Sequence, residues 1–175
     1  PLYSSAASDV YKRQSQLFWQ RAALAAPSGI IPSHSPAQSD PMHIEEKPPF
    51  DTPFEWIGGQ DRVRALVERF YDLMDLEPAY KELRASHGST LQAARDKLFM
   101  FLCGWLGGPD LYVEQFGHPR LRMRHMPFSI GILERDQWLA CMDQAMGETG
   151  VDPVLRERLK QSFFQTADWM RNRGG

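Results

Sequence analysis

The stretch 117–128 carries the residues best suited to chemistry. A histidine, His125, directly follows a run with three arginines, Arg120, Arg122 and Arg124, and a Pro-Phe pair closes the stretch. An imidazole is a common protein ligand of haem iron, and planar guanidinium groups suit the carboxylates at the edge of that cofactor. On composition alone a simpler interpretation is favoured, in which His125 ends a short surface helix and the arginines are solvated, because most histidines bind nothing.

Apolar residues at helical spacing predict the elements that must position this stretch. Four main helices are expected at 63–74, 89–105, 134–146 and 152–170, and no segment has the alternation of a strand. Ser89 is expected to cap the second helix with Gln92 reaching back to it, and Asp152 followed by proline starts the last helix. Residues 110–117 are expected to form an irregular connection after a Gly-Gly-Pro terminator, and Gly147 with Gly150 is expected to close the third helix. The predicted fold class is all-α.

Composition and charge describe a globular chain of 175 residues that is long enough to bury a core. With 42% hydrophobic residues, 24% charged residues and a net charge of −2, it is not expected to bind nucleic acid or an anionic membrane surface. Its apolar runs are too short to span a bilayer and no basic start with an apolar core marks secretion, so we expect a cytoplasmic protein. Cys103 and Cys141 lie in helical apolar patterns and are interpreted as small buried residues.

The beginning of the chain is not expected to belong to the fold. Ser4 to Gln14 can be encoded by consecutive codons of a widely used transposon-based sequencing adapter, so residues 1–14 are interpreted as an artefact. Residues 15–53 are rich in proline, serine and alanine and are expected to be a disordered extension. His34 and His43 lie in this extension and, without a rigid frame, are not expected to bind a metal.

Three polar aromatic side chains distinguish the chain from a plain helical bundle. Tyr71, His87 and Trp138 fall on or beside apolar faces in three separate segments, and each needs a hydrogen-bond partner where it is buried. The segment 110–128 is long, irregular and rich in arginine, which favours a ligand-binding role over a simple connection.

The folded part resembles the group II truncated haemoglobins. The residues that carry the resemblance are Gly58-Gly59 before the first helix, Phe70-Tyr71 within it, Trp105 to Pro109, Tyr112, the stretch 117–128, and Glu134 to Leu139. The resemblance implies a two-over-two helical sandwich, a shortened globin fold, over residues 54–172 that encloses one haem b.

The resemblance also implies a role for each candidate site residue. His125 matches the proximal ligand of the iron, with Nε2 on the metal and the other ring nitrogen donating to a backbone carbonyl. Tyr71, His87 and Trp138 match the distal side and are expected to supply up to three hydrogen-bond donors, although Gly88 stands where the family commonly has proline. The residues expected to contact the haem or its carboxylates are Phe70, Ala94, Lys97, Leu98, Phe101, Tyr112, His118, Arg122, Arg124, Phe128 and Met142.

These residues lead us to expect a haem protein that binds O2, NO, CO or peroxide. Donors in a dry pocket stabilise the charge on bound O2, so its release is expected to be slow. Turnover such as nitric oxide oxidation or peroxide reduction with an unidentified reductase stays open, as does a monomeric or homodimeric state. In peroxide reduction, His87 is the best candidate acid or base. The alternatives are a cofactor-free helical interaction module, a haem-based gas sensor acting through a partner, and a mononuclear metal site formed by His87, His118 and His125.

Overall fold

The computed structural model describes residues 50–174 of the chain. The expectations for residues 1–14, for most of the extension 15–53, and for His34 and His43 lie outside the described residues. Helix α2 (Pro53–Ile57) begins at the last residue of the expected extension. Thr52 caps this helix, because its Oγ1 accepts a hydrogen bond of 3.1 Å from the Glu55 backbone N–H.

Helix α3 (Gly59–Leu76) carries the first predicted apolar face. Gly58 precedes this helix and Gly59 is its first residue, with φ of 101° and 78°. Glycine adopts this region of φ without strain, so the predicted turn at the glycine pair is confirmed. The helix is longer at both ends than the predicted 63–74. Its buried residues are Val63, Leu66, Val67, Phe70, Tyr71, Leu73 and Met74.

The corner after α3 is built from two short helices, the 3-10 helix η1 (Pro78–Tyr80) and α4 (Lys81–Ala85). The Arg84 guanidinium closes the corner by donating to the backbone carbonyls of Gly88 at 2.9 Å and Ser89 at 3.3 Å. The end of α4 is therefore held close to the start of the next long helix.

Helix α5 (Gln92–Trp105) begins later than predicted. The predicted cap at Ser89 is wrong, because that residue belongs to the corner and the N-cap position of α5 has no side-chain hydrogen bond. The Gln92 side chain donates forward to the Asp96 carboxylate at 3.3 Å instead of reaching back. The predicted end of the helix is confirmed, since Gly107 follows with a φ of 94°.

The predicted irregular connection at 110–117 is wrong, because it contains helix α6 (Leu111–Phe116). The segment has no proline or glycine between Pro109 and Gly117, so a single short helix can form between these breakers, but it is too short to show a period in the sequence. Helix α7 (Leu121–His125) follows and ends at the predicted residue.

The last two helices, α8 (Ile132–Glu148) and α9 (Pro153–Met170), occupy the predicted regions. The Asp152 cap is confirmed, because its Oδ1 accepts bonds of 2.9 and 3.1 Å from two backbone N–H groups of the first turn. Helix α8 continues past Gly147, and the chain turns at Gly150, whose φ is 70°.

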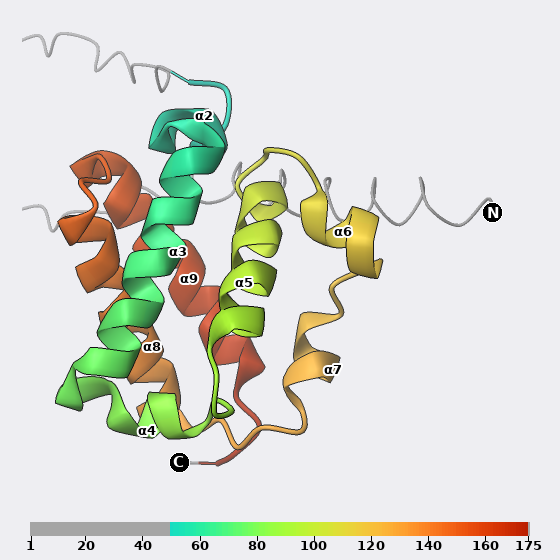
Figure 1. Cartoon of the computed structure of the whole chain (residues 1–175), viewed down its shortest axis with the longest axis vertical. Coiled ribbons are helices and arrows are strands. Elements are labelled where there is room, and N and C mark those ends of the chain that lie inside the picture. Colours follow the sequence, from blue (N-terminus) through green and yellow to red (C-terminus); the bar gives the residue numbers. More distant parts are fainter. Residues whose placement is uncertain (1–49, 175) are drawn as a thin grey trace, which may run out of the picture.

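Two pairs of helices form the two layers of the fold (Figure 1). Helix α3 lies beside α5, α8 lies beside α9, and α3 packs across α8. Trp105 at the end of α5 stacks on Phe163 of α9 with ring centroids 4.9 Å apart, which joins the two layers. Every regular element within residues 50–174 is a helix, so the expected all-α, two-over-two sandwich is confirmed. In the same range no helix has the length and hydrophobicity needed to cross a membrane.

Candidate functional site

A cavity of about 600 Å³ lies between the layers, on the side where α5, α7 and the ends of α8 and α9 approach one another. Its walls are mainly aliphatic and aromatic, and a few polar side chains point to it, which is typical of a small-molecule or cofactor site. The predicted site residues that line this cavity are Tyr71, His87, Ala94, Lys97, Leu98, Phe101, Tyr112, Arg124, His125, Phe128 and Trp138.

His125 ends α7 and lies half-buried in the wall of the cavity. Its Nδ1 lies 2.7 Å from the backbone carbonyl oxygen of Leu121, one turn earlier. A carbonyl oxygen can only accept, so Nδ1 carries a proton, and in the neutral ring Nε2 has the lone pair. The hydrogen bond expected for this ring is therefore present. The Asn172 side chain donates to the backbone carbonyls of His125 at 3.2 Å and Phe128 at 2.7 Å, which fixes the end of α7 against the C-terminal segment.

His87 lies in the corner after α4 and makes a matching hydrogen bond. Its Nδ1 lies 2.9 Å from the backbone carbonyl oxygen of Leu83, again one turn earlier. Burial lowers the pKa of the His87 imidazole against the opposing effect of the Leu83 bond, and the charges of Arg84 and His125 lower it further. The neutral ring is thus favoured, with its proton on Nδ1.

Tyr71 and Trp138 reach the cavity from α3 and α8. Burial raises the pKa of the Tyr71 phenol, so the hydroxyl stays neutral and can donate or accept. The Trp138 ring lies between Phe70 and Phe163, with both centroid distances 5.4 Å. Within residues 50–174 neither the Tyr71 hydroxyl nor the Trp138 indole N–H has a hydrogen-bond partner, so both remain available to a molecule in the cavity.

Two cations stand in the cavity wall near α6. The Lys97 ammonium lies 5.7 Å from the centroid of the Phe116 ring, and the Arg124 guanidinium lies 5.9 Å from that of Tyr112. Neither forms an ion pair with a carboxylate in the described part of the chain, whereas Arg95, Arg135 and other arginines do. Their positive charge is therefore available to an anionic group at this edge.

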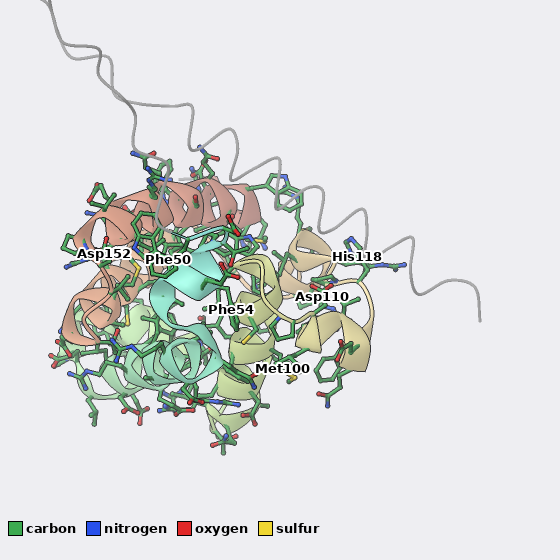
Figure 2. The ribbon with its side chains drawn as sticks, turned by 90° about the horizontal axis from the view of Figure 1, so that it is seen from above. Phe50, Phe54, Met100, Asp110, His118 and Asp152 are labelled. Carbon is green, nitrogen blue, oxygen red and sulfur yellow. The ribbon has the colours of Figure 1, made fainter. Side chains whose placement is uncertain are left out.

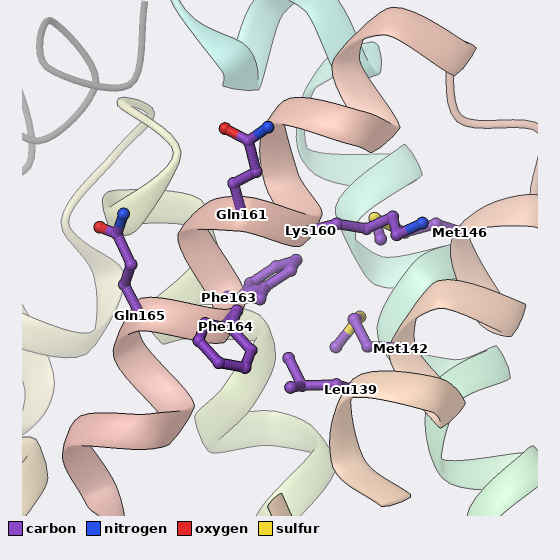
Figure 3. Close-up of a pocket in the computed structure, with 8 residues that line it drawn as sticks. All are labelled: Leu139, Met142, Met146, Lys160, Gln161, Phe163, Phe164 and Gln165. Atoms are coloured by element: carbon purple, nitrogen blue, oxygen red, sulfur yellow. The ribbon is translucent and has the colours of Figure 1, made fainter. Parts of the chain in front are cut away.

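Four predicted contact residues lie away from the cavity wall. Phe70 is fully buried behind Trp138. Met142 lines a second cavity, of about 490 Å³, between α8 and α9 (Figure 3). His118 is at the periphery of the molecule (Figure 2), where its Nδ1 accepts a 3.1 Å bond from the Arg120 backbone N–H. The Arg122 guanidinium donates to the backbone carbonyl of Trp169.

Part of the cavity wall was not assigned to the site from the sequence. The C-terminal helix α9 contributes Phe163, Ala167 and Met170. Their helical spacing predicts that they are buried, but it does not predict that they line a cavity. Phe163 also lines the second cavity. Neither Ile130 nor Leu121, which lies within the stretch 117–128, is expected from the sequence to contact a ligand, because their segments are too short to show a helical period.

The three-histidine metal site is not supported. Residues 50–174 contain no group of three His, Cys, Asp or Glu side chains close enough to hold a metal ion together. His118 bonds to its own loop, and only His87 and His125 reach the cavity.

The cavity of about 600 Å³, called the main cavity below, has side chains that fit a haem. Two imidazoles line this cavity, those of His87 and His125, and each has Nδ1 anchored to a backbone carbonyl one turn earlier, as metal-ligating histidines have. His125 directly follows Arg124, which also lines the cavity. Lys97 and Arg124 suit the two carboxylates, and the apolar walls suit a flat macrocycle. Cys103 and Cys141 are buried in the core and take no part in the cavity.

Comparison with known proteins agrees with this fold. The model of the bacterial-like globin family matches residues 52–172. The group 2 truncated hemoglobin YjbI of Bacillus subtilis is 39% identical over 123 residues, covering 70% of this chain and 90% of that protein. The structure of a cold-adapted truncated hemoglobin from the Antarctic bacterium Pseudoalteromonas haloplanktis has a TM-score of 0.69 and 47% identity, covering 71% of this chain and 100% of that one. The group II 2-on-2 hemoglobin of Agrobacterium tumefaciens has a TM-score of 0.69 and 43% identity, covering 73% and 98%. The chain therefore belongs to the bacterial-like globin family, as a truncated haemoglobin of the second group.

Proposed function

We propose that this protein holds one haem b in the main cavity, with His125 as the axial ligand of the iron, and binds O2 and other diatomic gases there. Membership of the truncated globin family implies haem-based gas binding. His87 makes the same kind of bond, so the observation that carries the assignment of His125 is its place on α7 directly after Arg124 in the cavity wall, together with the 2.7 Å bond that anchors its Nδ1 to the Leu121 carbonyl.

The remaining walls divide into two groups by their chemistry. Leu98, Phe101 and Phe128 offer apolar surface to the macrocycle, and Lys97 with Arg124 offers positive charge to its carboxylates. When bound, the haem supplies an iron centre that takes a diatomic ligand and can exchange electrons with it.

The side of the cavity formed by α3 and α8 supplies hydrogen bonds to a ligand. The Tyr71 hydroxyl and the Trp138 indole N–H both lack a protein partner in the described residues and can donate to a gas ligand that carries partial negative charge. Ala94 is small and leaves room for such a ligand beside α5. Two donors in a water-poor pocket slow the release of O2, which suits retention or redox chemistry better than delivery.

Turnover belongs to the same proposal. Oxidation of nitric oxide by bound O2 and reduction of peroxide both fit a polar pocket of this kind, and either needs an electron donor, which we take to be a separate reductase. A cytoplasmic site of action and a monomeric or homodimeric state go with this proposal.

An optical spectrum of the purified protein tests the proposal. We expect a Soret band that shifts when O2 or CO is added to the reduced protein, and we expect His125→Ala to lose the haem. Met123→Ala is the matched control, because Met123 lies on the same short helix, is exposed and does not line the cavity. A colourless protein, or a His125→Ala variant with the wild-type spectrum, would favour a cofactor-free interaction module or another ligand.

A further inference from the structure

We propose that His87 is a proton acceptor in the main cavity that assists ligands carrying a proton, hydrogen peroxide and small hydroperoxides, and adds nothing to the binding of O2 and CO. This inference rests on the proposed function, because such ligands are bound and reduced in the same cavity. From the sequence, His87 is expected to be a third hydrogen-bond donor and the candidate acid or base in peroxide reduction, and the hydrogen bonds of its ring indicate which of these roles it can fill.

The hydrogen bonds at the end of α4 fix which nitrogen of His87 is protonated. The backbone carbonyl of Leu83 accepts from the Ser86 hydroxyl at 2.7 Å, and the His87 Nδ1 faces the same oxygen at 2.9 Å. A carbonyl has only lone pairs, so an unprotonated Nδ1 at that distance would be repelled. The Ser86 hydroxyl uses its proton on Leu83, and its 3.3 Å contact with Nδ1 then places an oxygen lone pair towards the same N–H.

The other ring nitrogen, Nε2, is therefore left with its lone pair. A neutral imidazole has one donor and one acceptor, and the donor is used on Leu83. Every hydrogen bond of the His87 ring within residues 50–174 is made by Nδ1. The partial burial of the ring favours its neutral form.

Three polar aromatic side chains of the cavity, those of Tyr71, His87 and Trp138, then differ in what they offer. Trp138 can only donate, Tyr71 can donate or accept, and His87 can only accept while it is neutral. The rings of Tyr71 and His87 are neighbours, with centroids 5.9 Å apart in an edge arrangement. O2 and CO have no proton to give, so the lone pair of His87 has no favourable contact with them. Hydrogen peroxide has both protons and lone pairs and can satisfy all three groups.

The chemical step that His87 can perform is a proton transfer. An O–H bond of hydrogen peroxide breaks, its proton moves to Nε2, and the products are a hydroperoxide anion and an imidazolium ring. Charge and atoms balance without any other reactant. The Leu83 carbonyl accepts from Nδ1 throughout, so it stabilises the imidazolium while it holds the ring in place.

Opposite effects on two rates test this assignment in the haem-loaded protein. We expect His87→Phe to slow the reaction of the ferric protein with hydrogen peroxide by about a hundredfold or more, the range usual for loss of a general base. The same variant should change O2 dissociation from the ferrous protein by less than about twofold, because no donor is lost. Tyr71→Phe is the comparison variant, since it removes a donor and should accelerate O2 release. Faster O2 release in His87→Phe by about tenfold with an unchanged peroxide rate would overturn the proposal.

Nitrogen NMR of the wild-type protein gives a readout that depends on neither turnover nor a variant. In the diamagnetic CO complex of the ¹⁵N-labelled protein we expect His87 to show a protonated Nδ1 and an unprotonated Nε2. A proton on Nε2 would refute the acceptor role even if the variants misfold. A protein that binds neither CO nor O2 would instead refute the proposed function, so the two failures are distinguishable.

Discussion

Replacement of Trp138 by phenylalanine tests whether the indole N–H holds bound O2. Trp138 packs between Phe70 and Phe163 with both centroid distances 5.4 Å, so a phenyl ring keeps an aromatic contact with each and removes the donor. A hydrogen bond of this kind contributes about 1–1.5 kcal/mol, which corresponds to about a 5- to 13-fold faster dissociation of O2. The Tyr71 hydroxyl stays in place, so binding itself should persist.

The assay is stopped-flow mixing of the O2 complex with CO, which reports the O2 dissociation rate. Trp169→Phe is the matched control, because it makes the same change on an exposed ring of α9 that does not line the cavity. Thermal unfolding of both variants separates a loss of the donor from a loss of packing. An O2 dissociation rate in Trp138→Phe equal to that of the control would refute the reasoning and leave Tyr71 as the sole donor.

Three further predictions concern stability. A Cβ at Gly108 would lie 2.6 Å from ring atoms of Phe54, so Gly108→Ala should lower the free energy of unfolding in urea by about 1–3 kcal/mol. In a Phe54→Ala background the ring is absent, so Gly108→Ala should cost less. The Ser162 hydroxyl is buried without a partner in the described residues, so Ser162→Ala should leave stability unchanged or raise it by about 1 kcal/mol, and a clear loss would reveal a hidden partner. Burial raises the pKa of the Cys103 thiol from 9.0 to about 11. The contribution of this thiol to the free energy of unfolding is therefore complete below pH 9 and is lost as the pH rises towards 11. Urea unfolding should therefore show a shallower alkaline loss for Cys103→Ala, and identical pH profiles would contradict the buried neutral thiol.

The long helices and their ends could be predicted wherever the signal is local. The apolar face of α3, the Asp152 cap and the glycine pair before α3 depend on residues within one or two turns of one another, and each is present as predicted. The predictions that failed concern short segments. Ser89 has the right residue type for a cap, but the corner after α4 uses its carbonyl for Arg84, and helix α6 is too short to have a period.

The order and chemical type of the site residues are determined by the sequence, and so are the family resemblance and the choice of His125. The tertiary structure alone decided which of them meet: it gathered eleven predicted residues around one cavity, placed Arg122 and His118 elsewhere, and added a wall from α9. It also placed His87 in the cavity wall with Nδ1 bonded to Leu83, which is the basis of its proposed role as an acceptor. The reason is that a hydrogen bond depends on distances and directions of a few tenths of an ångström, and spacing along a chain does not specify these until the helices pack.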